Sequence, residues 1–136
     1  MNLLEIIKMY FDSSVNSRIE LFQEITHPNF IRFGLGNSNE LYYMSRDEVI
    51  NQSLIGLSKA RETIPNFKCS FKIKKITHLT IHDVIASIGV EWIMMMTDSV
   101  GIHCTCFHLA KDEGKWILVN ALDRGKEGLI KIPESI

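Results

Sequence analysis

The residues of this chain that could do chemistry are few, and they lie in distant segments. Asn120 is the most informative, because it interrupts the apolar alternation of Trp116, Leu118 and Leu122 in a predicted strand. A buried amide must find hydrogen-bond partners. Those partners could be other core groups or a ligand.

Two tyrosines and a histidine are further candidates. Tyr10 lies on the apolar side of a predicted N-terminal helix, and Tyr43 lies in a short strand, so each could present a hydroxyl. His27 stands directly before Pro28, where the second helix should end. Its imidazole could make a structural hydrogen bond there, or it could lie at the mouth of a cavity.

Cys104, Cys106 and His108 project to one side of a predicted strand, and thiolates and imidazoles are good zinc ligands. Alternate residues on a flat strand lie too far apart for easy tetrahedral closure, however, and only Asp123 could add a fourth ligand. We therefore predict no metal site and no cofactor. A Ser-His-Asp order, a glycine-rich phosphate loop and a paired-carboxylate motif are also missing from the sequence.

Composition limits the possible partners. The chain has 136 residues, 46% of them hydrophobic, and a net charge of -1. This balance predicts no general attraction to nucleic acid or to an anionic membrane, and no stretch approaches the roughly 20 apolar residues of a membrane span. Three unevenly spaced cysteines are typical of reduced thiols, which favours a cytoplasmic location.

The first half of the chain should contain three helices, at 2–11, 16–25 and 45–56, because apolar residues recur there at three- and four-residue spacing. Asn16 or Ser17 could cap the second helix. Ser45 and Glu48 fit a capping box at the start of the third. We expect that helix to lose regularity after Gly56.

Strands should fill the remainder. Two short ones are predicted at 29–33 and 40–44, and four long ones at 65–81, 84–96, 102–112 and 115–123. A change of apolar phase after Ile73 predicts a β-bulge near Lys74-Lys75, and Glu113-Gly114 should form a tight hairpin loop. Segregated helices and an antiparallel sheet indicate a single α+β domain over residues 1–136.

The long strands carry apolar residues on both faces. With a tight hairpin at 113–114, the inner face should collect Trp92, Thr105, Phe107, Trp116, Leu118 and Asn120. The other face should carry Ile93, Met95, Cys104, Cys106, Ile117, Val119 and Ala121. A sheet covered on one side only is normally polar on the other. The second apolar face therefore predicts another cover, most simply a homodimer through this outer face.

Three segments carry a family resemblance: LFQEITHPNFIRFG, LYYMSRDEVI and FHLAKDEGKWILVNALD. They resemble SnoaL-like proteins of the nuclear transport factor two-like superfamily, and within it the lumazine-binding proteins. The resemblance implies a cone, in which a curved antiparallel sheet wraps around three N-terminal helices and a cavity opens between them. It also implies a dimer through the outer sheet face.

That superfamily includes isomerases, dehydratases, cyclases and proteins without known activity, so the fold does not determine the function. The chain also departs from the common pattern. Asn29 stands where relatives often have aspartate, and Thr105 and Cys106 stand where they often have an acid and an aromatic residue. No catalytic acid can be assigned from those positions.

Three hypotheses follow. The first is a cone that binds a small, mostly apolar molecule through Tyr10, His27, Tyr43, Trp92, Phe107, Trp116, Leu118 and Asn120. The second is an isomerase- or dehydratase-type enzyme that uses a histidine base and a tyrosine hydroxyl in the same cavity. The third is a non-catalytic interaction module whose cavity is filled by its own side chains.

Overall fold

The computed structural model describes residues 2–35, 40–97, 99–125 and 130–131, so most of the predicted turn at 34–39 and of the tail after 125 lies outside the described residues. The helical elements are α1 (Leu3–Val15), α2 (Ile19–Ile25), α3 (Arg46–Val49), the π-helix η1 (Ile50–Leu54) and α4 (Ile55–Thr63). The strands are β1 (Thr26–Leu35), β2 (Leu41–Ser45), β3 (Cys69–His82), β4 (Ile85–Met96), β5 (Ser99–Asp112), β6 (Lys115–Gly125) and β7 (Ile130–Lys131).

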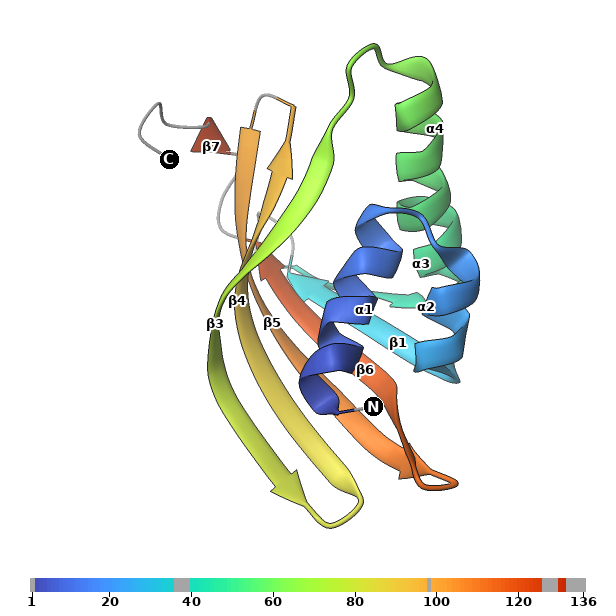
Figure 1. Ribbon diagram of the computed structural model, residues 1–136, viewed down its shortest axis with the longest axis vertical. Coiled ribbons are helices and arrows are strands. Elements are labelled where there is room, and N and C mark those ends of the chain that lie inside the picture. The colour runs from blue at the N-terminus through green and yellow to red at the C-terminus, as the bar shows by residue number, and fades with distance from the viewer. Residues whose placement is uncertain (1, 36–39, 98, 126–129, 132–136) are drawn as a thin grey trace.

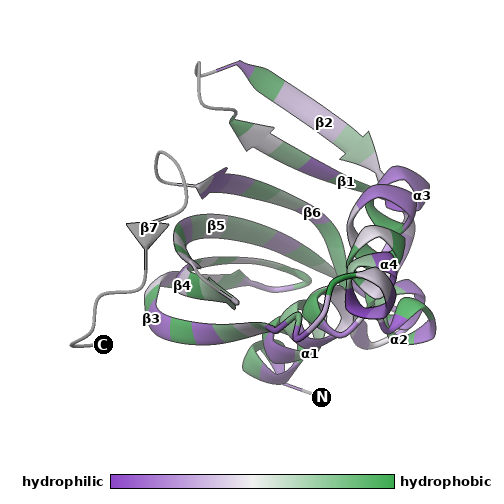
Figure 2. Ribbon diagram, turned by 90° about the horizontal axis from the view of Figure 1, so that it is seen from above, coloured by the Kyte–Doolittle hydropathy of each residue, from purple (hydrophilic) through white to green (hydrophobic). Residues whose placement is uncertain are grey.

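The strands form one curved sheet in the order β2-β1-β6-β5-β4-β3, with β7 pairing with β5 off this path. The helices lie along its concave side (Figure 1), and the view from above shows the sheet curving around them (Figure 2). The predicted α+β cone is thus confirmed. The prediction of a wholly antiparallel sheet is wrong, because β1 runs parallel to β6. No hairpin joins these two strands, so nothing forces them to be antiparallel.

Helix α1 buries one face against the sheet. The Asn2 side chain accepts a hydrogen bond from the Glu5 amide and caps the helix. The helix extends four residues beyond its predicted end at Phe11. The buried Ser13 hydroxyl donates to the Tyr10 carbonyl, so its polar atom needs no water, and Val15 continues the apolar face.

Helix α2 ends at Ile25 as predicted, but neither proposed capping residue caps it. The helix starts after Arg18, which makes no side-chain capping bond. The Ser17 hydroxyl instead donates to the Leu54 carbonyl at 2.6 Å. That bond ties the turn between the first two helices to the third helical segment.

The third helical segment begins with the predicted capping box of Ser45 and Glu48. Its irregularity lies before Gly56 rather than after it. Residues Ile50–Leu54 form a π-helix, and regular α-helix then continues to Thr63. π-Helical turns are rare and occur frequently at functional sites.

Register shifts in the sheet decide which side chains face the helices. The predicted bulge in β3 is confirmed between Ile73 and Lys75, and a second follows between Ile76 and His78. The hairpin loop between β5 and β6 is also confirmed, because Glu113 and Gly114 both have positive φ, as a two-residue type I′ turn requires. Leu109 pairs with Leu118 as expected.

Beyond that pair the prediction for β6 fails. The register shifts between His108 and Leu109, so Asn120 lies opposite His108, Ala121 opposite Phe107, and Asp123 opposite Thr105. The phase of β6 is therefore inverted in its second half. Ala121 and Asp123 face inward and are buried, while Asn120 points to the outer face.

The core fills the space between the helices and the concave face. Its largest fully buried side chains include Phe11, Phe22, Phe30, Phe107, Leu54 and Leu118. Tyr10 contacts four aromatic rings, with its ring centroid 5.0 Å from that of Phe107. Within the described ranges, no helix is long and apolar enough to span a membrane.

Candidate functional site

A cavity of about 290 Å³ lies between the helices and the concave face of the sheet. Its lining residues are Tyr10, Phe11, Ser14, Val15, Arg32, Gln52, Ser53, Gly56, Leu57, Trp92, Met94, Thr105 and Asp123. Aromatic and aliphatic groups make up much of the wall, and a small number of polar groups converge on it. This composition is typical of small-molecule sites.

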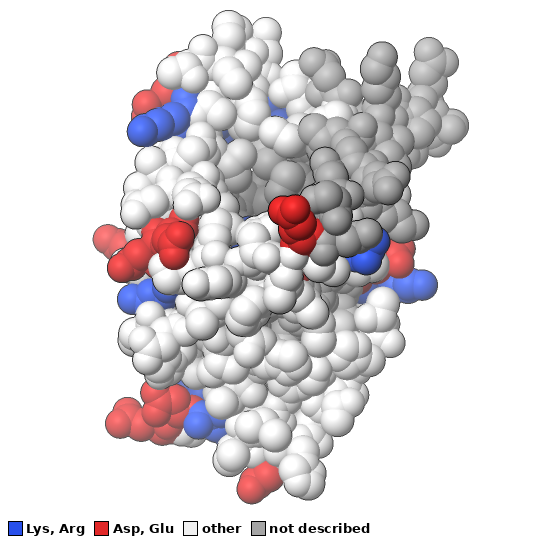
Figure 3. Space-filling view, turned by 180° about the vertical axis from the view of Figure 1, so that it is seen from behind, with Lys and Arg blue, Asp and Glu red and all other residues white. Residues whose placement is uncertain are grey.

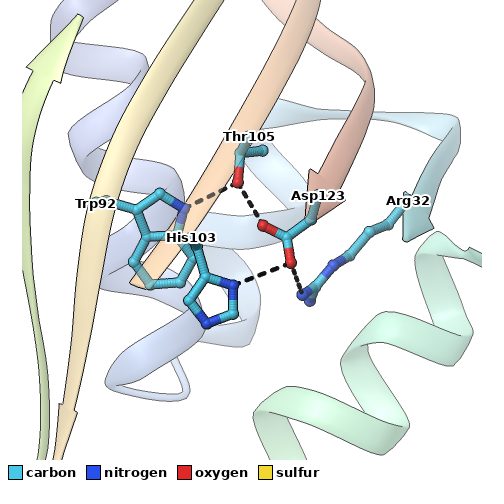
Figure 4. Close-up of polar contacts among 5 residues, drawn as sticks. All are labelled: Arg32, Trp92, His103, Thr105 and Asp123. Atoms are coloured by element: carbon cyan, nitrogen blue, oxygen red, sulfur yellow. Dashed lines mark hydrogen bonds and ion pairs between the residues drawn. The ribbon is translucent and has the colours of Figure 1, made fainter. Parts of the chain in front are cut away.

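The polar part of the wall is centred on the Asp123 carboxylate (Figure 4). The Thr105 hydroxyl donates to Oδ1 at 2.6 Å, and His103 Nδ1 donates to Oδ2 at 3.2 Å. The Arg32 Nη2 atom lies 3.6 Å from Oδ2. The carboxylate thus has partners from β5 and β1, and it is itself 7% exposed.

Trp92 extends this network to β4. Its indole Nε1 donates to the Thr105 hydroxyl at 2.8 Å, so Thr105 accepts one hydrogen bond and donates another. The His103 ring stacks on the Trp92 ring at a centroid distance of 4.4 Å and an interplanar angle of 18°. The stacking and the hydrogen bond together fix the orientation of the imidazole.

The sheet register explains why these residues meet. Trp92 pairs with His103 across β4 and β5, and Thr105 pairs with Asp123 across β5 and β6. Paired residues share a face. Because of the register shift in β6, Asp123 reaches the inner face beside Thr105.

Burial by itself raises the pKa of Asp123. The hydrogen bond from His103 and the charge of Arg32 outweigh that effect, with help from the hydrogen bond of Thr105, so the pKa lies below its usual value. Burial also raises the pKa of Tyr10, which keeps its phenol protonated and able to donate. At neutral pH the wall therefore holds one carboxylate, one guanidinium and one neutral phenol.

Two buried polar atoms of the cavity wall have no hydrogen-bond partner in the described structure: Ser14 Oγ and Arg32 Nε. Such atoms are rare in folded proteins and call for a specific explanation.

The third helical segment also contributes to the cavity. Gln52 is exposed and belongs to η1, and the next turn brings Gly56 to the wall. The irregular helix thus forms part of the cavity's edge.

The structure brings two of the predicted site residues to this cavity, Tyr10 and Trp92. Phe107 and Leu118 are fully buried in the core on the same face but do not line it. Trp116 is half-buried, packs against the core and lies 5.2 Å from Lys111 Nζ. The inward placement of Trp92, Phe107, Trp116 and Leu118 is correct. Of these four residues, only Trp92 is part of the wall.

Three polar candidates lie elsewhere. Tyr43 is on strand β2 and is 69% exposed, so it does not line the cavity. His27 Nδ1 accepts a hydrogen bond from the Asn29 amide at 3.0 Å, which is the structural role considered for it. Asn120 was predicted to face inward, and that placement is wrong. On the outer face its Oδ1 accepts from His108 Nδ1 at 2.6 Å.

Sequence reasoning did not place Arg32 or Asp123 in the cavity. Arg32 lies in a short segment with no clear alternation, so the sequence did not indicate which face of the sheet its side chain occupies. Asp123 was assigned to the opposite face because strict alternation was carried through the end of β6. A signal was available, since two adjacent apolar residues, Ala121 and Leu122, break the alternation there.

The outer face gathers the sulfur and imidazole groups considered as metal ligands. Cys106 Sγ lies 3.7 Å from His78 Nε2 and 4.0 Å from His108 Nε2. Glu91 forms ion pairs with Lys74 and Lys75 on the same face. Among the residues that the structure describes, no three His, Cys, Asp or Glu side chains are arranged to hold a metal ion.

No protein-family model and no curated protein matches the chain. Several solved structures do match it. An NTF2-like protein of unknown function from Silicibacter pomeroyi has a TM-score of 0.65 and 17% identity, covering 91% of this chain and 92% of that one. An NTF2-like protein from Cytophaga hutchinsonii has a TM-score of 0.68 and 12% identity, covering 93% and 100%.

A protein with a cystatin-like fold from Caulobacter vibrioides has a TM-score of 0.64 and 17% identity, covering 92% of this chain and 87% of that one. The chain therefore has the NTF2-like, cystatin-like fold. At these identities the likeness extends to the fold alone. The function must be argued from the site.

The depressed pKa of Asp123 predicts a pH-dependent contribution to stability. The ionised carboxylate stabilises the fold fully above the pKa of an unfolded aspartate, about 4, and the contribution is lost as the pH falls through the lower folded pKa. Asp123→Asn should lower the free energy of unfolding by about 2 kcal/mol at neutral pH. This deficit should shrink as the pH falls from about 5 to about 3. Urea denaturation across that range measures it.

The matched control is Asp83→Asn, at an exposed turn residue with positive φ that asparagine also tolerates. Its free energy of unfolding should follow that of the parent protein across the range. A deficit for Asp123→Asn that stays constant with pH would contradict the role given to the carboxylate.

Proposed function

We propose that the protein binds a small, mostly apolar molecule in the cavity between its helices and its sheet. The observation that carries this proposal is the composition of the wall. Tyr10, Phe11, Trp92 and Met94 offer apolar surface, while the partly exposed Arg32 guanidinium and the protonated Tyr10 phenol offer donors. A ligand would satisfy both features together.

Binding has more support than catalysis by a histidine and a tyrosine. His103 is held by Asp123, and His27 is held by the Asn29 amide. The described residues contain no hydrogen bond between a histidine and Tyr10 or Tyr43. Asp123 itself is a weak base, because its partners lower the pKa of the carboxyl.

An interaction module with a self-filled cavity also has less support. Met94 and Trp92 lie in the wall and leave the cavity open, and Trp116 is not part of that wall. The space of about 290 Å³ is close to the lower end of the range for small-molecule pockets.

The finer family assignment is part of the proposal. The segments LFQEITHPNFIRFG and FHLAKDEGKWILVNALD support a place among the SnoaL-like and lumazine-binding proteins.

Composition and length support three further proposals. Balanced charge and three free cysteines support a cytoplasmic protein, and the chain length of 136 residues supports one domain. The charge balance also argues against nucleic acid and membranes as partners.

A second copy of the chain is the partner that we propose for the outer sheet face. Ile85 and Leu122 are 55% and 43% exposed there. Ile117 lies two strands from Ile85, while Ile93 and Ile102 pair with each other farther along the sheet. In the rear view, charged side chains lie along the margins, and one acidic side chain also lies near the middle of the face (Figure 3). Exposed apolar side chains on an outer sheet face suit a homodimer interface.

Blocking the cavity tests the binding proposal. A Cβ atom built on Gly56 meets no atom within 4 Å, so a side chain can be added there without a clash at its Cβ. Gly56→Trp should place an indole in the cavity mouth and abolish binding of N-phenyl-1-naphthylamine, a neutral probe that fluoresces in apolar surroundings. Native mass spectrometry of protein purified from its own cell should likewise show a retained small molecule in the parent and none in Gly56→Trp.

The matched control is Gly56→Ala, which leaves the mouth open. It should bind the probe as the parent does and gain about 0.5–1 kcal/mol in stability, because alanine is the better helix former. Probe binding that is equal in the parent and in Gly56→Trp would place the site elsewhere and contradict the proposal.

The dimer has its own test. Ile85→Glu and Leu122→Lys each put a charge into the proposed interface and should convert a dimer to a monomer in sedimentation equilibrium. Tyr43→Lys, at an exposed residue of the edge strand β2, is the control and should leave the dimer intact. A parent protein that is monomeric at about 50 μM, where a specific dimer with micromolar Kd is largely formed, would refute this interface.

A further inference from the structure

We propose that the ligand carries a carboxylate, and that the Arg32 guanidinium binds this group inside the cavity. This inference rests on the proposed binding function and names the chemical class of the molecule. It follows from the hydrogen-bond donors and acceptors of the wall, from its charge and from the apolar surface around it.

The acceptors at Asp123 and Thr105 are already used. Asp123 Oδ1 accepts from Thr105, and Asp123 Oδ2 accepts from His103 and faces Arg32. The Thr105 hydroxyl accepts from the Trp92 indole while it donates to Asp123. A ligand that brought only donors would find few free oxygen atoms in this part of the cavity.

The donors of the wall are in excess. A guanidinium has five N–H bonds. In Arg32, Nη2 is the atom paired with Asp123, at 3.6 Å, and Nε has no partner in the described structure. The protonated phenol of Tyr10 can also donate. The missing component is therefore an acceptor group.

Charge favours an anionic acceptor. Asp123 lies against one Nη atom of Arg32, at 3.6 Å, and the Arg32 side chain is still 20% exposed, so the guanidinium remains available to an anion. The planar guanidinium fork matches a carboxylate in geometry. Arg32 is the one Lys or Arg side chain among the described residues that line the cavity, which suits a single negative charge better than a phosphate.

The remainder of the wall defines the body of the ligand. Phe11, Val15, Leu57, Trp92 and Met94 surround the space with apolar surface. An aromatic or branched aliphatic body would bury against these groups while its carboxylate reached Arg32. The class is therefore a small aromatic or aliphatic monocarboxylic acid.

Three probes of one shape test the inference: 2-naphthoate, 2-naphthamide and 2-naphthylmethylamine, titrated into the full chain by isothermal calorimetry at neutral pH. The parent should bind the carboxylate at least about tenfold more tightly than the neutral amide, since hydrogen bonds to charged groups have this strength. The amine should bind most weakly, because it brings a second cation to Arg32.

Variants of Arg32 locate the preference. Arg32→Gln should bind 2-naphthoate and 2-naphthamide equally. Arg32→Lys keeps a cation beside Asp123 and so protects the fold, but it lacks the planar fork and should retain only part of the preference. Arg18→Gln removes an exposed cation that pairs with Asp12 away from this cavity, and it should keep the full preference.

The outcomes separate the two proposals. If the amide and the carboxylate bind the parent equally and Gly56→Trp abolishes both, the cavity is a binding site but ordered water satisfies its donors, and the carboxylate inference is overturned. A preference that survives unchanged in Arg32→Lys, or in a folded Arg32→Gln protein, overturns it as well. If no probe binds the parent, the binding function itself fails.

Discussion

The buried Asp123 carboxylate is the interaction on which the candidate site depends. A charge in this position is costly unless it is paired and hydrogen-bonded. Thr105, His103 and Arg32 meet that requirement, and they connect three strands of the sheet around one group. Trp92 adds the fourth strand through Thr105. The network fixes the polar side of the cavity, while the aromatic cluster around Tyr10 fixes its apolar side.

Much of the fold could be predicted from the sequence because local rules decide it. The capping box at Ser45, the type I′ hairpin at Glu113-Gly114 and the bulge near Lys74 each depend on a few neighbouring residues, and all are present. The parallel pairing of β1 with β6 could not be predicted in this way, because it joins segments about 90 residues apart.

The candidate site was harder to predict, since one register shift decides it. A shift of one residue turns every later side chain to the other face. In β6 it exchanges Asn120 for Ala121 and Leu122 for Asp123. The predicted inner amide therefore pairs with His108 on the outside, and an unpredicted acid enters the cavity. Tyr10 and Trp92 were assigned correctly because neither lies beyond that shift.

The fold is shared with NTF2-like proteins of unknown function, so it gives a scaffold and leaves the chemistry to the side chains. In this chain the cavity combines an apolar wall, a fully engaged carboxylate and unused donors. That combination suits recognition of a molecule better than proton transfer, because the one acid in the wall is held ionised by its neighbours. Residues of the π-helix and Gly56 line the edge of this cavity.

The most direct test uses the two tryptophans of the chain as internal reporters. The Trp92 indole N–H lies in the cavity wall, whereas Trp116 lies outside it beside Lys111. In a ¹⁵N-correlated spectrum, titration with N-phenyl-1-naphthylamine should move the Trp92 indole resonance and leave that of Trp116 in place. A shift of Trp116 alone, or no shift of either resonance, would contradict ligand binding in this cavity.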